Sequence, residues 1–394
     1  MASICLNMIV RNEAHVIIQT LKNICQHIPI NYWVISDTGS TDNTAQLIQD
    51  FFKEQQIPGE LLFHPWINFA ENRNHALSAC ADKSDYVLFF DADDYFEGDF
   101  KLPELNCDAY DFQMSNCSKR LRYHRKLLIK NNYGFQWRGI LHEFIESPNR
   151  ITTGMITGNY LIVSGHLSHR NQDPDKYLKD AQILEQAFYQ GKDVDLLARY
   201  AFYCAQSYQD YGSTNKAIYW YKKRIEMQSG CQDEQYLSYM QLGLLHESYK
   251  NIQDALYYWQ CGIALDPLRA ECWYHLARWH SWNGNFSLAY CLSKLGSQIQ
   301  KPVGSRLSIQ HSIYDYLCLY EWCLNAYRLD KIEDSYTAFK LLVAQCPSDL
   351  IDRISHQIST YTHLILKDAF QEVQALHKHL TRQGKEHLIQ ITLR

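Results

Sequence analysis

The sequence predicts an α/β domain with a mostly parallel sheet, followed by an all-α region. Over the first 100 residues, apolar runs of strand length alternate with segments of helical spacing. This alternation is typical of a parallel sheet with helices on both faces. From about residue 107 the pattern changes to short strands with turns, and after residue 173 strand signals nearly vanish. We therefore expect domains at residues 1–172 and 173–394.

The expected elements of the first domain follow one another closely. Residues 3–10 form a mostly apolar run, and residues 14–24 have helical spacing. The polar turn from Asp37 to Asp42 offers N-cap residues for the helix that follows it. The short later strands are typical of a smaller mixed sheet that closes one side of a site. Further strands are expected at residues 32–36, 61–63, 86–90, 109–114, 122–129, 134–137 and 160–163, and further helices at 43–52 and 69–81.

The second half carries a weak internal repeat. Ala217-Ile-Tyr-Trp-Tyr is followed 38 residues later by Ala255-Leu-Tyr-Tyr-Trp, and Ala289 lies 34 residues after Ala255. Small and aromatic residues at this period are typical of tetratricopeptide-like helix pairs. We expect about three to five such pairs in a curved array.

Composition and charge exclude several classes of protein. The net charge of −5, with scattered Lys and Arg, gives no general attraction to nucleic acid or to anionic membranes. We expect no signal peptide and no transmembrane segment. The 13 cysteines form no C-x-x-C pair, which favours reduced, core-packed thiols. These features predict a cytoplasmic protein, with an exported effector left open. The basic residues 119–130 suit either a solvated strand face or contact with phosphate or an acceptor.

An acidic corner follows the fourth expected strand. The apolar run Val87–Phe90 leads directly into Asp91-Ala92-Asp93-Asp94. Such a short apolar run predicts a strand buried on both faces, and ligands of open α/β sheets bind beyond the carboxyl ends of strands. Clustered carboxylates repel one another unless a cation or strong donors lie among them. The corner is therefore a candidate Mg²⁺ or Mn²⁺ site, and the alternative is an acidic loop that caps a helix.

Asp37 is a second candidate at a strand end. It lies beside a glycine-containing turn, where its carboxylate can accept from a nucleobase N–H or a ribose hydroxyl. The alternative is turn formation, since Asp and Gly favour tight turns.

Five separated motifs occur in the order and spacing of one protein family: Met8-Ile9-Val10-Arg11-Asn12-Glu13, Asp37-Thr38-Gly39-Ser40-Thr41-Asp42, Phe69-Ala70-Glu71-Asn72-Arg73-Asn74, Asp91-Ala92-Asp93 and Trp137-Arg138-Gly139-Ile140-Leu141-His142-Glu143. On these motifs, residues 3–170 resemble family 2 glycosyltransferases, which have the GT-A fold. The last motif is similar to the distal G-x-x-H-E segment of members that carry helical repeats. Bacterial members of this group modify peptides or surface glycans.

The resemblance implies a role for each matching residue. Asp37 would contact the nucleotide base, and Asn12 and Glu13 would line the same pocket. Arg73 would lie near the donor. Asp91 would hold the ribose or a metal-bound water, while Asp93 would bind the metal that bridges the donor diphosphate and neutralises charge on the leaving group.

Sugar transfer with inversion also needs a base that takes the proton of the acceptor. Glu143 is the candidate by its place in the motif, and Asp94 is its rival. His142 would orient Glu143 or contact a phosphate. A third metal ligand would come from His166 or His169. Because residues three apart on a strand point to opposite faces, one of the two should face the site, and we favour His169.

The sequence thus predicts a metal-dependent, inverting glycosyltransferase that uses Mn²⁺ or Mg²⁺ and a nucleotide-sugar. A UDP-sugar as donor and the inversion rest on the family resemblance alone. The acceptor would be a protein, a peptide or a glycan, bound with help from the helical repeats, and a homodimer is left open. The alternative is a repeat scaffold with a catalytically idle nucleotide-sugar-binding module. A nucleotidyltransferase is disfavoured, since no glycine-rich basic loop follows the first strand.

Overall fold

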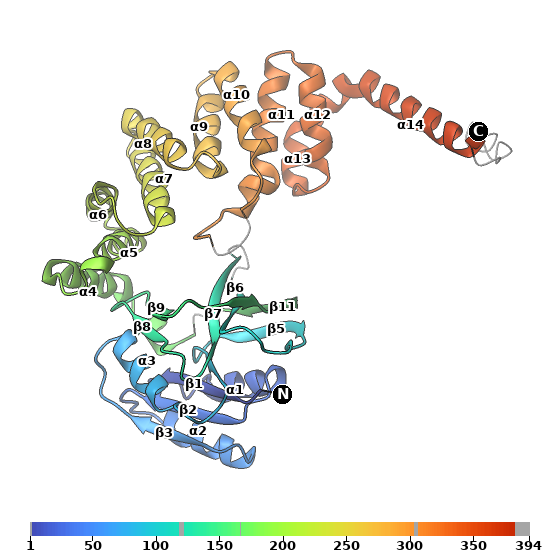
Figure 1. Cartoon of the computed structure of the whole chain (residues 1–394). Coiled ribbons are helices and arrows are strands. Elements are labelled where there is room, and N and C mark those ends of the chain that lie inside the picture. The colour runs from blue at the N-terminus through green and yellow to red at the C-terminus, as the bar shows by residue number, and fades with distance from the viewer. Residues whose placement is uncertain (1, 118–121, 166, 303–305, 383–394) are drawn as a thin grey trace. The chain divides into compact units, whose positions relative to one another are not determined.

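The computed structural model describes residues 2–117, 122–165, 167–302 and 306–382 (Figure 1). Its contacts divide the chain into two compact units. The first contains Met1–Ala255 with Pro302–Ile309, and the second contains Leu256–Lys301 with Gln310–Arg394. The sheet and the first helices after it therefore belong to one unit.

The predicted alternation of strands and helices is confirmed at the N-terminus. β1, β2 and β4 consist almost entirely of buried residues, whereas the edge strand β3 is half-buried. The elements are β1 (Ile4–Val10), α1 (Ile17–His27), β2 (Tyr32–Asp37), α2 (Thr44–Glu54), β3 (Gly59–Phe63), α3 (Phe69–Ser78) and β4 (Tyr86–Phe89).

The sheet is parallel where the site is expected. β1 pairs in parallel with both β2 and β4, with Val10 opposite Asp37 and Asn7 opposite Phe89. The carboxyl ends of these strands therefore meet at one edge. Because alternate side chains point to opposite faces, Leu88 packs in the cluster with α1 and α2 while Val87 packs in the cluster with α3. Helices thus cover both faces, as predicted.

The later strands differ from the expected smaller sheet, because they extend the main sheet. β7 pairs antiparallel with β4, and the described sheet has the order β3-β2-β1-β4-β7-β6-β11-β5, with β10 beside β6. Only β8 and β9 pair separately in the described chain. The bounds are β5 (Tyr95–Phe100), β6 (Ala109–Ser115), β7 (Arg122–Lys130), β8 (Gln136–Arg138), β9 (Phe144–Glu146), β10 (Thr153–Met155) and β11 (Gly158–Val163).

Helices follow, and within the described residues no strand comes after β11. The repeat positions are core positions: Ala217, Ala255 and Ala289 are fully buried, as is Trp259. This burial is what packed helix pairs require. The helices are α4 (Lys176–Gln190), α5 (Leu197–Asp210), α6 (Thr214–Glu226), α7 (Gln232–Ser248), α8 (Ile252–Leu265), α9 (Ala270–Trp282), α10 (Phe286–Gln298), α11 (Cys318–Arg328), α12 (Ile332–Val343), α13 (Ser348–Ile354) and α14 (Thr362–Arg382), with short helical turns η1 (His169–Gln172), η2 (Val194–Leu196), η3 (Ile313–Leu317) and η4 (Ser355–Tyr361).

Two further expectations concern the whole chain. In the described part of the chain, no helix has both the length and the apolar character needed to cross a bilayer. The change from strands to helices lies between Val163 and His169. A domain division at residues 172 and 173 therefore follows the secondary structure and stays a proposal, since the first compact unit extends to Ala255.

Candidate active site

The loops after β1 and β2 hold each other through side-chain hydrogen bonds. Asn12 has the left-handed φ of 57°, and its Oδ1 accepts from the Thr41 N–H at 2.7 Å. Asp37 is 2% exposed, and its Oδ1 accepts from the N–H groups of Gly39 and Ser40 at 2.9 and 2.7 Å. Asp37 therefore forms the turn, which was the alternative role, and its contact with a nucleobase stays a prediction.

Glu13 lies at the start of α1. Its N–H donates to Oγ1 of Thr44 at 2.8 Å, and its carbonyl accepts from the N–H groups of Val16 and Ile17. The residue is 6% exposed. These contacts give its backbone a role in joining the β1 loop to α1 and α2.

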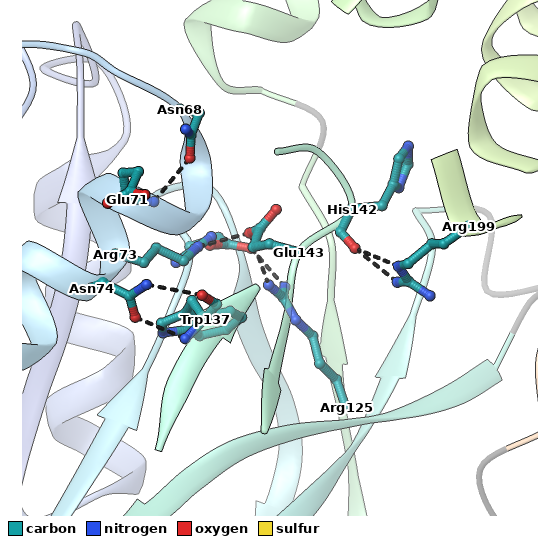
Figure 2. Close-up of polar contacts among 10 residues, drawn as sticks. Asn68, Glu71, Arg73, Asn74, Arg125, Trp137, His142, Glu143 and Arg199 are labelled. Atoms are coloured by element: carbon teal, nitrogen blue, oxygen red, sulfur yellow. Dashed lines mark hydrogen bonds and ion pairs between the residues drawn. The ribbon is translucent and has the colours of Figure 1, made fainter. Parts of the chain in front are cut away.

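Four charged side chains meet at the carboxyl edge of the sheet. Arg73 of α3 donates from Nη2 to Oδ1 of Asp91 at 2.6 Å and from Nε to Oε1 of Glu143 at 2.8 Å. Arg125 of β7 donates from Nη1 to Oδ2 of Asp91 at 2.8 Å, and its Nη2 lies 3.9 Å from Oε1 of Glu143. We call these four residues the edge cluster. Figure 2 shows Arg73, Arg125 and Glu143 converging.

The edge cluster contains two cations and two anions, whose side chains are partly shielded from solvent. The side chains of Arg73 and Glu143 are 6% and 9% exposed, and those of Arg125 and Asp91 are 27% and 31% exposed. Burial alone would raise the pKa of Asp91, but Arg73 and Arg125 outweigh it and hold this pKa well below its ordinary value. Both Asp91 oxygens accept from guanidinium groups, so a ribose or metal contact by Asp91 would compete with these pairs.

Helix α3 also fixes the hairpin that leads to Glu143. The side chain of Asn74 donates to the carbonyl of Trp137 at 2.9 Å and accepts from its N–H at 2.7 Å (Figure 2). The Arg73 guanidinium lies 4.9 Å from the ring centroid of Trp137. At the start of α3, Asn68 caps the helix by accepting from the Glu71 N–H. One helix thus positions both Arg73 and the β8 strand.

The remaining two carboxylates of the acidic corner differ in environment. Asp93 is half-buried, and its Oδ2 accepts from the Ser168 N–H at 2.8 Å. A Cβ at Gly165 would lie only 2.0 Å from the Asp93 carbonyl oxygen, so glycine is required there. Asp94 is 4% exposed, and burial followed by the charge of Asp91 raises its pKa well above the ordinary value. Its burial disfavours Asp94 as a base that meets an acceptor.

A divalent cation at the acidic corner would be held by Asp93 together with phosphates of the substrate. Among the described residues, no group of three or more His, Cys, Asp or Glu has a metal-binding arrangement. His166 lies outside the described residues, and so does the side chain of His169. Mg²⁺ is commonly held by one or two carboxylates together with substrate phosphates. Asp93, a hard oxygen donor at the strand end, fits that mode of binding.

His142 points away from Glu143. Its backbone has a left-handed φ of 51°, and Figure 2 shows its ring directed away from Glu143. The ring stacks on Tyr203 of α5 with centroids 3.9 Å apart. Part of the residue is exposed to solvent. Burial of the imidazole by the surrounding chain, followed by the positive charges of Arg199 and Arg170, lowers its pKa below the ordinary value. The described contacts include none between this ring and Glu143, so an orienting role for the side chain has no support.

Two arginines of the site were not predicted from the sequence. Arg125 lies in the basic stretch 119–130, for which phosphate contact and a solvated face were both considered. In the structure it is an ion-paired member of the edge cluster. Arg199 of α5 donates to the His142 carbonyl from Nη2 at 2.7 Å. No motif marks this residue, because a helical arginine in an amphipathic pattern is ordinarily a surface residue.

Comparison with known families agrees with this geometry. Residues 5–111 match the family model described as Glycosyl transferase family 2. Residues 5–111 therefore form a segment of a family 2 glycosyltransferase domain. The match includes Asn12, Asp37, Arg73 and the acidic corner, and it ends before Arg125 and Glu143. The edge cluster thus joins residues inside the matched family 2 segment to residues beyond it.

Solved structures give weaker likenesses. S. aureus TarS 1–349 in complex with UDP-GlcNAc is 14% identical, with 64% of this chain and 89% of that chain covered and a TM-score of 0.33. MamA is 16% identical, with 43% and 85% covered and a TM-score of 0.33. BtubC from P. vanneervenii is 13% identical, with 55% and 91% covered and a TM-score of 0.37. No curated protein matches significantly. At these TM-scores the likenesses carry no argument about the site.

Proposed function

We propose that the family 2 domain transfers a sugar from a nucleotide-sugar, a UDP-sugar, to a protein, peptide or glycan acceptor with inversion at the anomeric carbon. The observation that carries this proposal is the bond between Arg73 and Glu143. It holds a carboxylate beside the acidic corner, at the sheet edge where α/β domains bind ligands.

Glu143 suits the role of base in its geometry. Its Oε1 accepts from Arg73, while within the described residues Oε2 accepts from no donor. In the transfer step the acceptor oxygen attacks the anomeric carbon, and the bond from that carbon to the diphosphate oxygen breaks. The diphosphate leaves with the bonding electrons, and the acceptor proton passes to Oε2 of Glu143. The hydrogen bond from Arg73 orients the carboxylate before the step.

In this proposal the cations of the edge cluster would lie beside the diphosphate, where negative charge develops. Arg73 and Arg125 are each already paired with Asp91, so Asp91 keeps the two guanidinium groups in fixed positions. Fixed positive groups stabilise a leaving diphosphate because they need no rearrangement during the reaction. A Mn²⁺ or Mg²⁺ ion held by Asp93 would neutralise the same charge when bound. Asn12, Glu13 and Asp37 would form the nucleotide side of the pocket.

A donor screen tests this proposal against the idle-module alternative. The full chain is incubated with a panel of nucleotide-sugars, with and without Mn²⁺. The release of nucleoside diphosphate by hydrolysis of the donor is measured together with the thermal shift. We expect one UDP-sugar to stabilise the protein and to be hydrolysed only with metal. Stabilisation without hydrolysis or transfer would favour the idle module. The acceptor, a homodimer and the cytoplasmic location stay predictions.

A further inference from the structure

The turn that carries Glu143 is held from outside the sheet domain. Arg199 of α5 donates to the His142 carbonyl twice, from Nη2 at 2.7 Å and from Nε at 3.2 Å. Its Nη1 donates to Oε1 of Glu234 in α7 at 2.8 Å. The Glu234 side chain is 2% exposed. A buried carboxylate in the helices therefore anchors the guanidinium that binds the residue before Glu143. Figure 2 shows the two bonds from Arg199 to the His142 carbonyl.

Arg199 also contacts the residue after Glu143, through an aromatic ring. The Arg199 guanidinium lies 5.0 Å from the ring centroid of Phe144 and 4.7 Å from that of Tyr203. The ring of His142 stacks on the same Tyr203. Both chain neighbours of Glu143 thus contact Arg199, and His142 also contacts Tyr203, the aromatic partner of this arginine in α5.

The turn has a backbone that needs such support. His142 has a φ of 51° and Gly139 a φ of 97°. A residue with a side chain adopts a left-handed conformation at a cost in energy, and such conformations persist where surrounding contacts determine them. The N–H of Ile140 donates to the Tyr200 hydroxyl of α5 at 3.3 Å. Helix α5 therefore supplies contacts along the whole turn.

We propose that Arg199 is a positioning residue that fixes the turn of residues 139–144 to α5 and so keeps Glu143 in register with Arg73 and Asp91. This inference rests on the proposed role of Glu143 as base. Arginine suits the task because its planar fork donates to a carbonyl and a carboxylate at once, which a lysine ammonium does with less fixed geometry. The helices next to the sheet then belong to the catalytic apparatus and have more than an acceptor-binding role.

The decisive variant is Arg199→Lys, which keeps a cation beside Glu234 but loses the fork. Arg224→Lys is the matched control. Arg224 also faces Glu234, at 3.8 Å, and it donates to the carbonyls of Met227 and Cys231, outside the turn. Amide hydrogen exchange of a peptide that spans residues 139–144 is compared in the full-length proteins. We expect faster exchange there in Arg199→Lys and wild-type exchange in the control.

Kinetics then ask whether Arg199 acts through Glu143. With the UDP-sugar selected by the donor screen and water as acceptor, we expect Arg199→Lys to lower kcat by about 10- to 100-fold at an unchanged KM for the donor. Combined with Glu143→Gln, it should cause no further loss. A merely structural role would instead add its loss to that of Glu143→Gln.

The outcomes separate this inference from the proposed function. Unchanged exchange of residues 139–144 in Arg199→Lys would overturn the inference, as would additive losses in the double variant. Wild-type turnover by Glu143→Gln would overturn the base assignment. The exchange experiment would still report on the contact between Arg199 and the turn of residues 139–144. Tyr200→Phe, which removes the acceptor of the Ile140 N–H, is a milder second probe. We expect a smaller rise in exchange of the same peptide, and no rise in either variant contradicts the inference.

Discussion

Nε of Arg73 donates to Oε1 of Glu143 at 2.8 Å, and the two residues are 70 positions apart in the sequence. Arg73 lies inside the segment that matches the family 2 model, whereas Glu143 lies beyond it. The same guanidinium binds Asp91 through Nη2. One arginine therefore joins the strand-end motif of the family to the proposed base, and the predictions below test both ends of this connection.

Removal of the proposed base should separate donor binding from transfer. Glu143→Gln keeps an oxygen that accepts from Arg73 but cannot take a proton. We expect kcat to fall by about 10²- to 10⁴-fold, with the dissociation constant for the UDP-sugar unchanged by calorimetry. Glu146→Gln is the control, because Glu146 lies in the same hairpin and pairs with Arg138. Full turnover in Glu143→Gln, with loss in Asp94→Asn, would assign the base to Asp94.

The acidic corner should lose its metal response when Asp93 is changed. Asp93→Asn keeps an acceptor for the Ser168 N–H but offers a poorer ligand to a hard cation. We expect the thermal shift caused by Mn²⁺ in the presence of UDP to disappear, with the melting temperature of the ligand-free protein little changed. Asp99→Asn in the exposed part of β5 is the control. A thermal shift with Mn²⁺ equal to that of the wild type would show that the cation binds at other residues.

The sequence was a good guide where side-chain burial follows a period. The strands near the site and helices α1 to α3 were predicted within a few residues, since the strands are short apolar runs and the helices have helical spacing. β5 was missed because Glu97, Gly98 and Asp99 are exposed in this edge strand and only Phe96 is buried. No residue period marks such a strand. Its place depends on pairing with β11, which lies far along the chain.

The site was predicted in its motifs and less well in its contacts. Arg73 and Glu143 were both chosen from motifs, and the structure brings them together. The double pairing of Asp91 was not foreseen, because Arg125 comes from a separate strand whose register decides which basic side chain reaches the edge. His142 was expected beside Glu143, but adjacent residues at a turn with positive φ point in different directions. Such contacts depend on tertiary geometry that no local pattern contains.

The edge cluster should make stability depend on pH through Asp91. The pKa of Asp91 is lowered in the fold, so its contribution is present above the unfolded carboxyl pKa of about 3.9 and is lost as the pH falls below it. Near neutral pH we expect Asp91→Asn to destabilise the protein by on the order of 2 kcal/mol. Urea unfolding at several pH values should show this difference shrinking from pH 6 towards pH 3. A difference that stays constant would contradict the pairing.

His142 should affect the stability of the protein at low pH but not its turnover. Because its pKa is lowered in the fold, the unfolded chain takes up the proton first as the pH falls below about 6.5, and stability is lost. His142→Phe keeps a ring that stacks on Tyr203 and removes this proton uptake. We expect wild-type turnover, and a smaller loss of stability between pH 7 and pH 5 than in the wild type. A large fall in turnover would instead give the imidazole a role at the donor.

The first compact unit runs from the sheet through to Ala255, and this has a consequence for how the protein can change in evolution. A fragment that stopped at the last strand would contain every family motif yet lack Arg199, Tyr200 and Tyr203. Repeats further along the chain are free to diverge or to be exchanged, whereas α5 and α7 are constrained together with the turn at Glu143. The border between conserved and variable sequence in related proteins should therefore fall inside the helical region and not at its start.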